Sequence, residues 1–195
     1  MDMDTTLSNS FFYFFSAVPQ VLAAILALFG VFLIFKIQAL KEELIVKATD
    51  ILEYVRSSIQ NDKDDNEQLS KHRHLIFNSL ANWLKYKNIS TFHHIICKFG
   101  SDLSLNDNMF ATYSDQFIRI YNLHKGLIQA TKIFSIVTII TIIGCLSVIP
   151  SGEYFLNNPD KLKSLFFITI LCVTLCFVGL IIILHFALSN KSELP

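Results

Sequence analysis

Three long runs of uncharged residues constrain this chain more than any other feature of its sequence. Residues 5–35, 133–159 and 164–190 contain one charged side chain between them, that of Glu153. A helix of about 20 apolar residues is long enough to cross the hydrocarbon core of a bilayer. The sequence therefore predicts an all-α integral membrane protein with three transmembrane helices. The predicted spans are residues 11–35, 131–149 and 165–188, and the segments around them are a tail (1–10), a helical domain (36–130), a loop (150–164) and a second tail (189–195).

The charges outside these runs predict how the chain is oriented. Residues 36–132 carry 13 Lys and Arg residues, whereas the first ten residues carry Asp2 and Asp4 and no basic residue. Because segments rich in Lys and Arg stay in the cytoplasm, we expect the N-terminus outside and the helical domain and C-terminus inside. The acidic start also favours a retained anchor over a cleaved signal peptide, which begins with basic residues. The many Lys, Asn and Ile residues suggest a bacterial chain, for which the membrane would be the inner membrane.

The first span is predicted to continue as a helix into the cytoplasmic part. Apolar residues recur every three or four positions over residues 37–59, which is the period of one helical face. No glycine or proline interrupts this stretch, so we expect one helix from Pro19 to about Gln60. Proline is tolerated in the first turn of a helix. Pro19 therefore marks the helix start, with Ser16 as its cap, or a kink if the helix already begins at Phe11.

Three further helices are expected before the second span ends. Their boundaries follow from capping residues and from glycine, which commonly ends a helix. The expected elements are a polar loop at 61–66, a helix at 67–87, a helix capped by Ser90 and ended by Gly100, a loop at 101–106, and a helix that begins at Asp107 and runs toward the second span.

Small and weakly polar residues form one stripe on each predicted span. On the first span, Gln20, Ala23, Ala27 and Gly30 follow one another at helical spacing. Such stripes let helix backbones approach closely in lipid. They would pack against the chain's own spans, pack against another copy of the chain, or face a pore. The matching residues are Ser135 and Thr138 on the second span, and Thr169, Cys172, Cys176 and Gly179 on the third.

The sequence indicates no enzyme, no metal and no cofactor. No serine lies in a nucleophile-elbow sequence, and the six glycines are too scattered for a phosphate-binding loop. His93 and Cys97 share a helical face, but exposed or half-buried histidines explain the pattern better than a zinc site does. The cysteines predict no disulfide, because three lie in spans and Cys97 lies in the reducing cytoplasm. No Asp, Glu, Lys or Arg lies within a span, which argues against a proton relay, a voltage sensor or an ion-coupled transporter.

Lys85, Lys87 and Lys98, together with nearby aromatic residues, form a modest basic region. It could meet anionic headgroups, a nucleic acid or a nucleotide messenger. Because residues 36–132 carry 13 basic and 11 acidic side chains, headgroup contact or plain solvation is favoured and no nucleic acid is expected. The predicted partners are the lipid bilayer and other copies of the chain, and a cytosolic protein could bind through residues 36–130.

The order of one span with its N-terminus outside, a cytoplasmic helical domain and two further spans is similar to that of the proton-channel stator families of the ExbB, TolQ and MotA types. The resemblance is one of topology. Those families have glycine-rich second and third spans with polar gating residues, whereas only Gly144 and Gly179 lie in these spans here. Small membrane proteins with a cytosolic helical domain also occur as membrane-damaging effectors in bacterial phage defence, which is an analogy of class.

Two functional hypotheses follow. The first is an oligomeric inner-membrane protein, pore-like or channel-like, whose Ser, Thr and Cys stripes line the pore and whose cytoplasmic helices act as sensor or gate. The second is a membrane anchor or adaptor whose helical domain recruits a soluble partner. A pore needs polar stripes that face a shared axis, whereas an adaptor needs an exposed apolar patch on the helical domain. We favour the first.

Overall fold

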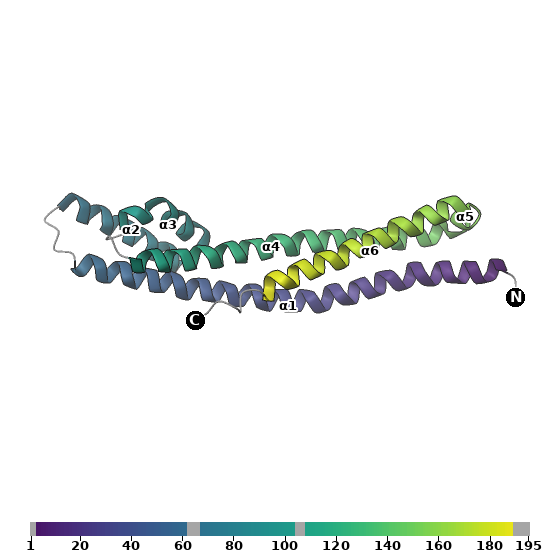
Figure 1. The fold of residues 1–195 in the computed structure, drawn as a ribbon, viewed down its shortest axis with the longest axis horizontal. Coiled ribbons are helices and arrows are strands. Elements are labelled where there is room, and N and C mark those ends of the chain that lie inside the picture. Colours follow the sequence, from purple (N-terminus) through teal and green to yellow (C-terminus); the bar gives the residue numbers. More distant parts are fainter. Residues whose placement is uncertain (1–2, 62–66, 104–107, 189–195) are drawn as a thin grey trace. The chain divides into compact units, whose positions relative to one another are not determined.

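The computed structural model describes residues 3–61, 67–103 and 108–188, and within these ranges it contains helices and no strand (Figure 1). Three helical stretches are long and apolar enough to cross a membrane: Thr6–Gln60, Met109–Leu156 and Pro159–Leu188. This confirms the predicted all-helical chain with three potential spans. The elements in order are α1 (Met3–Asn61), α2 (Glu67–Lys85), α3 (Ile89–Leu103), α4 (Asn108–Val148), the 3-10 turn η1 (Ile149–Ser151), α5 (Gly152–Leu156) and α6 (Pro159–Leu188).

The chain divides into two compact units. One comprises Met1–Lys36 and Leu127–Pro195, and it holds the apolar parts of α1 and α4 with α5 and α6. We call it the apolar unit. The other comprises Ile37–Gly126, and it holds the remaining parts of α1 and α4 with α2 and α3. We call it the helical domain.

Helix α1 begins at Met3, well before Pro19. Of the two alternatives for Pro19, the helix start is therefore wrong, and the helix begins before the proline, earlier even than Phe11. Ser16 does not cap it, because its hydroxyl donates to a carbonyl three residues earlier in the helix, at 3.0 Å. Inside a helix, a proline removes the hydrogen bond that its own N–H would have made and its ring crowds the carbonyl one turn earlier, which together cost about 3 kcal/mol. The earlier turns remain helical because they pack: the side chains of Phe11 and Phe15 are 1% and 0% exposed.

The segment predicted as the loop between the second and third spans, residues 150–164, is helical for most of its length. The turn Ile149–Ser151 and helix Gly152–Leu156 occupy its first part, and α6 begins at Pro159. Pro159 stands in the first position of α6, where a missing N–H costs nothing. Asp160 lies in the first turn, where a negative charge suits the positive end of the helix dipole.

This segment packs against the start of α1 through an aromatic cluster in the apolar unit. The ring of Phe166 in α6 lies 6.4 Å from that of Phe11 and 5.4 Å from that of Phe15. Gly152 is buried beside them. A Cβ at Gly152 would lie 2.7 Å from Cζ of Phe12, a distance that side chains do not tolerate. Glycine lets the start of α5 approach α1 this closely with the rings of Phe11 and Phe12 in place, whereas a larger residue would force them to shift.

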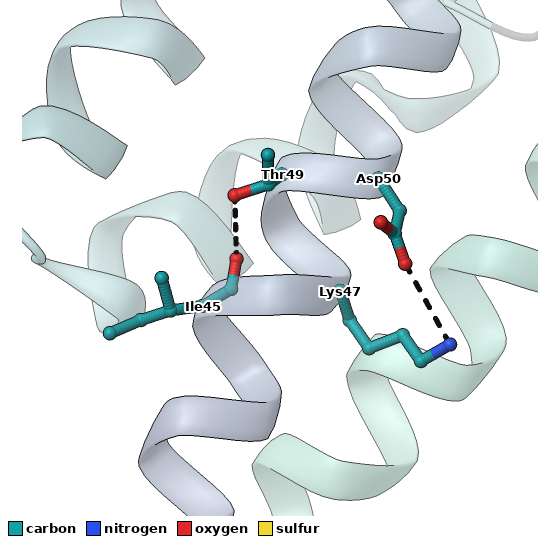
Figure 2. A network of polar contacts seen from close by, with 4 residues as sticks. All are labelled: Ile45, Lys47, Thr49 and Asp50. Carbon is teal, nitrogen blue, oxygen red and sulfur yellow. Dashed lines mark hydrogen bonds and ion pairs between the residues drawn. The ribbon is translucent and has the colours of Figure 1, made fainter.

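Apolar residues from all four helical segments form the core of the helical domain. The rings of Phe92 and Phe117 meet edge to face at 5.3 Å. Most charged side chains lie outside this core, although Arg73 is only 9% exposed. Lys47 and Asp50 form a partly exposed ion pair at 3.8 Å along α1 (Figure 2). Such a pair contributes only about 0.2–0.5 kcal/mol, so burial holds the domain together. The largest buried side chains are Leu44 and Ile51 of α1, Leu80 of α2, Phe92 of α3 and Phe117 of α4.

Two expected boundaries of α3 are wrong. The side chain of Asn88, not that of Ser90, caps the helix by accepting the N–H of Thr91 at 3.3 Å. The helix also passes through Gly100 to Leu103. Glycine ends a helix where it adopts a positive φ, and no described glycine does so here. Of the expected loops, residues 62–66 and 104–107 lie outside the described residues, and so does the expected helix start at Asp107.

Candidate functional site

Weakly polar residues of α4 and α6 come together in the apolar unit. Thr138 is 1% exposed, and its hydroxyl donates to the sulfur of Cys176 at 3.8 Å. The hydroxyl of Thr141 lies 3.8 Å from the same sulfur and donates to a carbonyl one turn earlier at 2.9 Å. We call these three residues the polar seam. Their polar atoms find partners inside one chain, which is the requirement for polar groups away from water.

The other predicted residues of the second and third spans are buried or half-buried in the same unit. Thr169 is buried, and its hydroxyl donates to the carbonyl of Leu165 at 2.9 Å. Ser135 and Cys172 are half-buried. Gly179 is also half-buried, and a Cβ there would lie 3.5 Å from the ring of Phe134 on α4. The structure thus brings the two stripes to one interface between α4 and α6.

A small cavity adjoins the seam. Its volume is about 10 Å³, and it is lined by residues of α1, α4 and α6. A cavity must reach roughly that size to hold even one water molecule. Within a single chain, the helices therefore pack closely at the polar seam and leave no room for a hydrated ion. The lining residues are Leu22, Ile25, Phe134, Thr138, Cys176, Phe177 and Leu180.

The stripe on the first span lies differently. Gln20, Ala23 and Ala27 are exposed on α1, and Gly30 is half-buried. A Cβ placed on Gly30 would meet nothing within 4 Å. The structure therefore does not join this stripe to the polar seam.

The residues of α1 that do pack inward were not singled out from the sequence. Phe11, Phe15, Leu22 and Leu33 are each 3% exposed or less. Their separations of four, seven and eleven residues are steps along one helical face. That spacing is the signal that could have found them. It is weak here because nearly every position of the run is apolar.

The three predicted lysines do not lie together. Lys85 is the last residue of α2 and Lys87 lies in the turn after it, and both are exposed. The expected end of this helix at Lys87 is therefore two residues late. Lys98 is exposed on α3, ten residues beyond Asn88, which is about 15 Å along a helix axis. The structure separates Lys98 from the other two.

A half-buried histidine joins α3 to α4 in the helical domain. The ring of His93 stacks on that of Tyr121, with centroids 4.0 Å apart and 16° between the planes. Its Nε2 lies 3.5 Å from the sulfur of Cys97. Burial lowers the pKa of His93, and the charges of Lys125 and His94 lower it further. A lowered pKa keeps this ring neutral near pH 7, which suits a stacked packing role.

A second histidine of the helical domain also has a lowered pKa. Burial lowers the pKa of His124 on α4, and the nearby charge of Lys41 on α1 adds to the effect. Across residues 3–61, 67–103 and 108–188, no three His, Cys, Asp or Glu side chains gather closely enough to hold a metal ion. Among the described histidines, His93 and His124 are therefore notable for their lowered pKa values and not as members of a metal-ligand set.

Comparisons with protein-family models, with curated protein sequences and with solved structures find no match for this chain. The functional argument therefore depends on the chain's own residues.

Proposed function

We propose that the protein is a self-associating membrane protein with a pore-like function, in which the helical domain acts as sensor or gate. The observation that carries the proposal is the outward position of Gln20, Ala23 and Ala27 on α1. An amide on the outer surface of a span needs water, a headgroup or another helix to satisfy it. A second copy of α1 offers an amide of its own, and the alanines let the two backbones approach.

The close packing of the polar seam favours an ion path between copies of the chain over an ion path within one chain. Thr138 and Cys176 bond to each other, and the adjoining cavity has a volume of only about 10 Å³. A shared pore would therefore be bordered by the outward face of α1. In this proposal the Ser, Thr and Cys stripes of α4 and α6 pack the helices, although the sequence favours them as the pore lining.

The cellular setting of the proposal comes from the distribution of charge. Thirteen Lys and Arg residues lie between residues 36 and 132, which supports a cytoplasmic helical domain and an outer N-terminus. The setting is the inner membrane of a bacterial cell. A role as a membrane effector of a defence system is the class analogy that fits this arrangement.

The adaptor hypothesis has less support. The large apolar side chains that are exposed on the described part of the helical domain lie on separate segments. They are Val46 of α1, Leu75 of α2, Tyr86 of the following turn and Met109 of α4. Apolar residues scattered singly over a surface are normal and do not mark a docking site.

The first test is the mass of the full chain in detergent, measured by light scattering with correction for bound detergent. We expect a defined oligomer of about four or more copies with closed symmetry, so that outward faces of α1 from several copies border one axis. Ala27→Leu and Gly30→Leu should each reduce its size. The control is Val21→Phe, which adds bulk at an exposed position beside the stripe. A monomer or a dimer would contradict the proposal.

The second test is ion flux through liposomes that contain the full chain. The unchanged protein should conduct, and Gln20→Leu should lower the flux more than Val21→Phe does. A purified oligomer that conducts no ions would refute the pore. It would leave the proposed self-association standing.

A further inference from the structure

We propose that the turn between α2 and α3, residues 85–88, docks on the anionic headgroups of the bilayer in which the chain's own spans lie. We call it the α2–α3 turn. It presents two lysines and a tyrosine at the end of the helical domain where α1 enters and α4 leaves. This inference does not depend on self-association or on a pore.

The backbone of the turn is the first observation. The N–H of Lys87 donates to the carbonyl of Leu84 at 2.8 Å, and the N–H of Asn88 donates to that of Trp83 at 3.0 Å. This pair of bonds is the Schellman ending of a helix, in which glycine usually holds the left-handed position. Here Lys87 holds it, with φ at 53°, the one non-glycine residue with positive φ among those described. A lysine kept at a strained position points to a use for its charge.

The side chains of the turn are the second observation. Lys85 and Lys87 are exposed, and Tyr86 between them is 68% exposed. Residues 68–101 contain five Lys and Arg residues and no Asp or Glu, so no carboxylate of this stretch competes for the lysines. Tyrosine is enriched where a protein meets the bilayer surface, because its ring is apolar and its hydroxyl is polar.

The place of the turn within the helical domain is the third observation. The hydroxyl of Tyr121 on α4 donates to that of Ser90 at 3.3 Å, and His93 stacks on the same tyrosine. The start of α3 is therefore level with Tyr121, near the end of the domain at Gly126. Lys87 precedes Ser90 by three residues and lies closer still to that end.

This end of the domain is also close to a predicted span in the sequence. Gly126 precedes Ile133, the first residue of the second uncharged run, by seven residues.

Anionic lipid fits this surface better than a nucleic acid does. Two lysines in a turn form a small patch, and residues 36–132 as a whole carry 13 basic and 11 acidic side chains. Nucleic acid binding draws on many phosphate contacts. The predicted spans tether the domain to the bilayer, which raises the effective concentration of headgroups near the turn. Even a weak attraction between each lysine and the headgroups can therefore produce docking.

The experiment uses the full chain in nanodiscs and its single tryptophan, Trp83, two residues before Lys85. One set of discs contains phosphatidylcholine alone, and the other contains roughly a third phosphatidylglycerol to supply anionic charge. Both carry a headgroup nitroxide that quenches nearby tryptophan. Quenching should be stronger in the anionic discs and should fall with added salt.

Variants separate charge from structure. Lys87→Gly removes the charge and relieves the left-handed strain, so it should raise the thermal midpoint while it lowers the quenching. Each lysine removed should lower the docked-to-undocked ratio about fivefold. Lys85→Gln with Lys87→Gly should therefore bring quenching to the level of the neutral discs. The control is Arg56→Gln, an exposed charge near the other end of the domain, beside Tyr54, which contacts Phe110 and Tyr113.

Three outcomes would overturn the inference. Equal quenching in both kinds of disc would show that anionic headgroups do not attract the turn. Unchanged quenching in Lys87→Gly with a raised thermal midpoint would leave Lys87 a purely structural residue. A single-stranded oligonucleotide that changes Trp83 emission in a lysine-dependent way would make the turn a nucleic acid site.

Discussion

The two units of the chain place opposite kinds of side chain on their surfaces, on helices of the same period. In the described part of the helical domain, Phe92 and Phe117 are fully buried, and the charged side chains other than that of Arg73 are exposed or half-buried. At the α4–α6 interface of the apolar unit, Thr138 is 1% exposed whereas Ile140 is 63% exposed. The residue types that form the core of one unit cover the surface of the other.

This reversal teaches which force holds each unit. In water, removing apolar area from solvent drives the helices together at roughly 25 cal/mol per Å². Between helices in lipid that drive is absent, because the acyl chains are as apolar as leucine. Close packing of small residues and hydrogen bonds such as Thr138 to Cys176 take its place. The same kind of substitution should therefore have unequal effects in the two units.

The largest expected effect is at the centre of the helical domain. Phe117→Ala removes a fully buried ring and should cost about 3–5 kcal/mol of stability. Phe167→Ala, at a 69% exposed position of α6, should cost less than about 0.5 kcal/mol. Hydrogen exchange of the full chain in detergent would report both. Equal protection loss in the two variants would contradict the contrast between the units.

The next effect tests close approach in the apolar unit. Gly152→Ala places a Cβ 2.7 Å from the ring of Phe12 and should cost about 1–3 kcal/mol through overpacking. Gly144→Ala is the matched control, because a Cβ there meets nothing within 4 Å. Thermal unfolding in detergent would compare them. If Gly152→Ala unfolds at the same temperature as Gly144→Ala, the tight contact between α5 and α1 is not maintained.

A pH effect should be confined to the helical domain. The pKa values of His93 and His124 are lowered in the folded chain, so the unfolded chain binds protons first as the pH falls. The contribution of the two neutral histidines to the stability of the helical domain is fully present above about pH 6.5, the ordinary pKa of histidine. It is lost as the pH falls through the lowered pKa values of the folded chain. Hydrogen exchange at decreasing pH, corrected for intrinsic rates, should show the helical domain loosening before the apolar unit.

Variants of the two histidines sharpen this prediction. His93→Gln combined with His124→Gln should flatten the pH dependence, and His74→Gln, at an exposed position of α2, should leave it unchanged. A pH response that is equal in both units, or that survives the double variant, would assign the effect to other groups.

The smallest expected effect is in the polar seam. Thr138→Val keeps the shape of the side chain and removes its hydrogen bond to Cys176. Such bonds between membrane helices contribute about 0.6 kcal/mol on average. A double-mutant cycle with Cys176→Ala would isolate the coupling between the two side chains. A coupling near zero would show that packing alone holds the seam.

Much of the fold could be predicted from the sequence, because its signals are local. The absence of charge over residues 164–190 indicates a span whatever surrounds it, and the spacing over residues 37–59 indicates a helix. The errors arise where local signals compete with packing. Pro19 reads as a helix start, yet buried Phe11 and Phe15 keep the preceding turns helical. Gly100 reads as a helix end, yet its backbone stays helical.

The candidate site was less predictable for a related reason. The sequence places Thr138 and Gln20 on similar stripes, and the structure buries one and exposes the other. In a run where almost every residue is apolar, the pattern carries little contrast between one helical face and another. Lys87 likewise reads as an ordinary helical lysine until its positive φ is seen.

By itself, the sequence determined that this chain is helical, that three of its stretches are long and apolar enough to span a membrane, and that its charges gather between the first two. Length, charge and period are properties of a segment, and a segment carries them into any fold. The tertiary structure alone decided which helix faces meet, that α5 packs closely against α1 at Gly152, and which polar groups form hydrogen bonds with one another. Those outcomes depend on the fit between surfaces distant in sequence, where a few tenths of an ångström separate close packing from a clash.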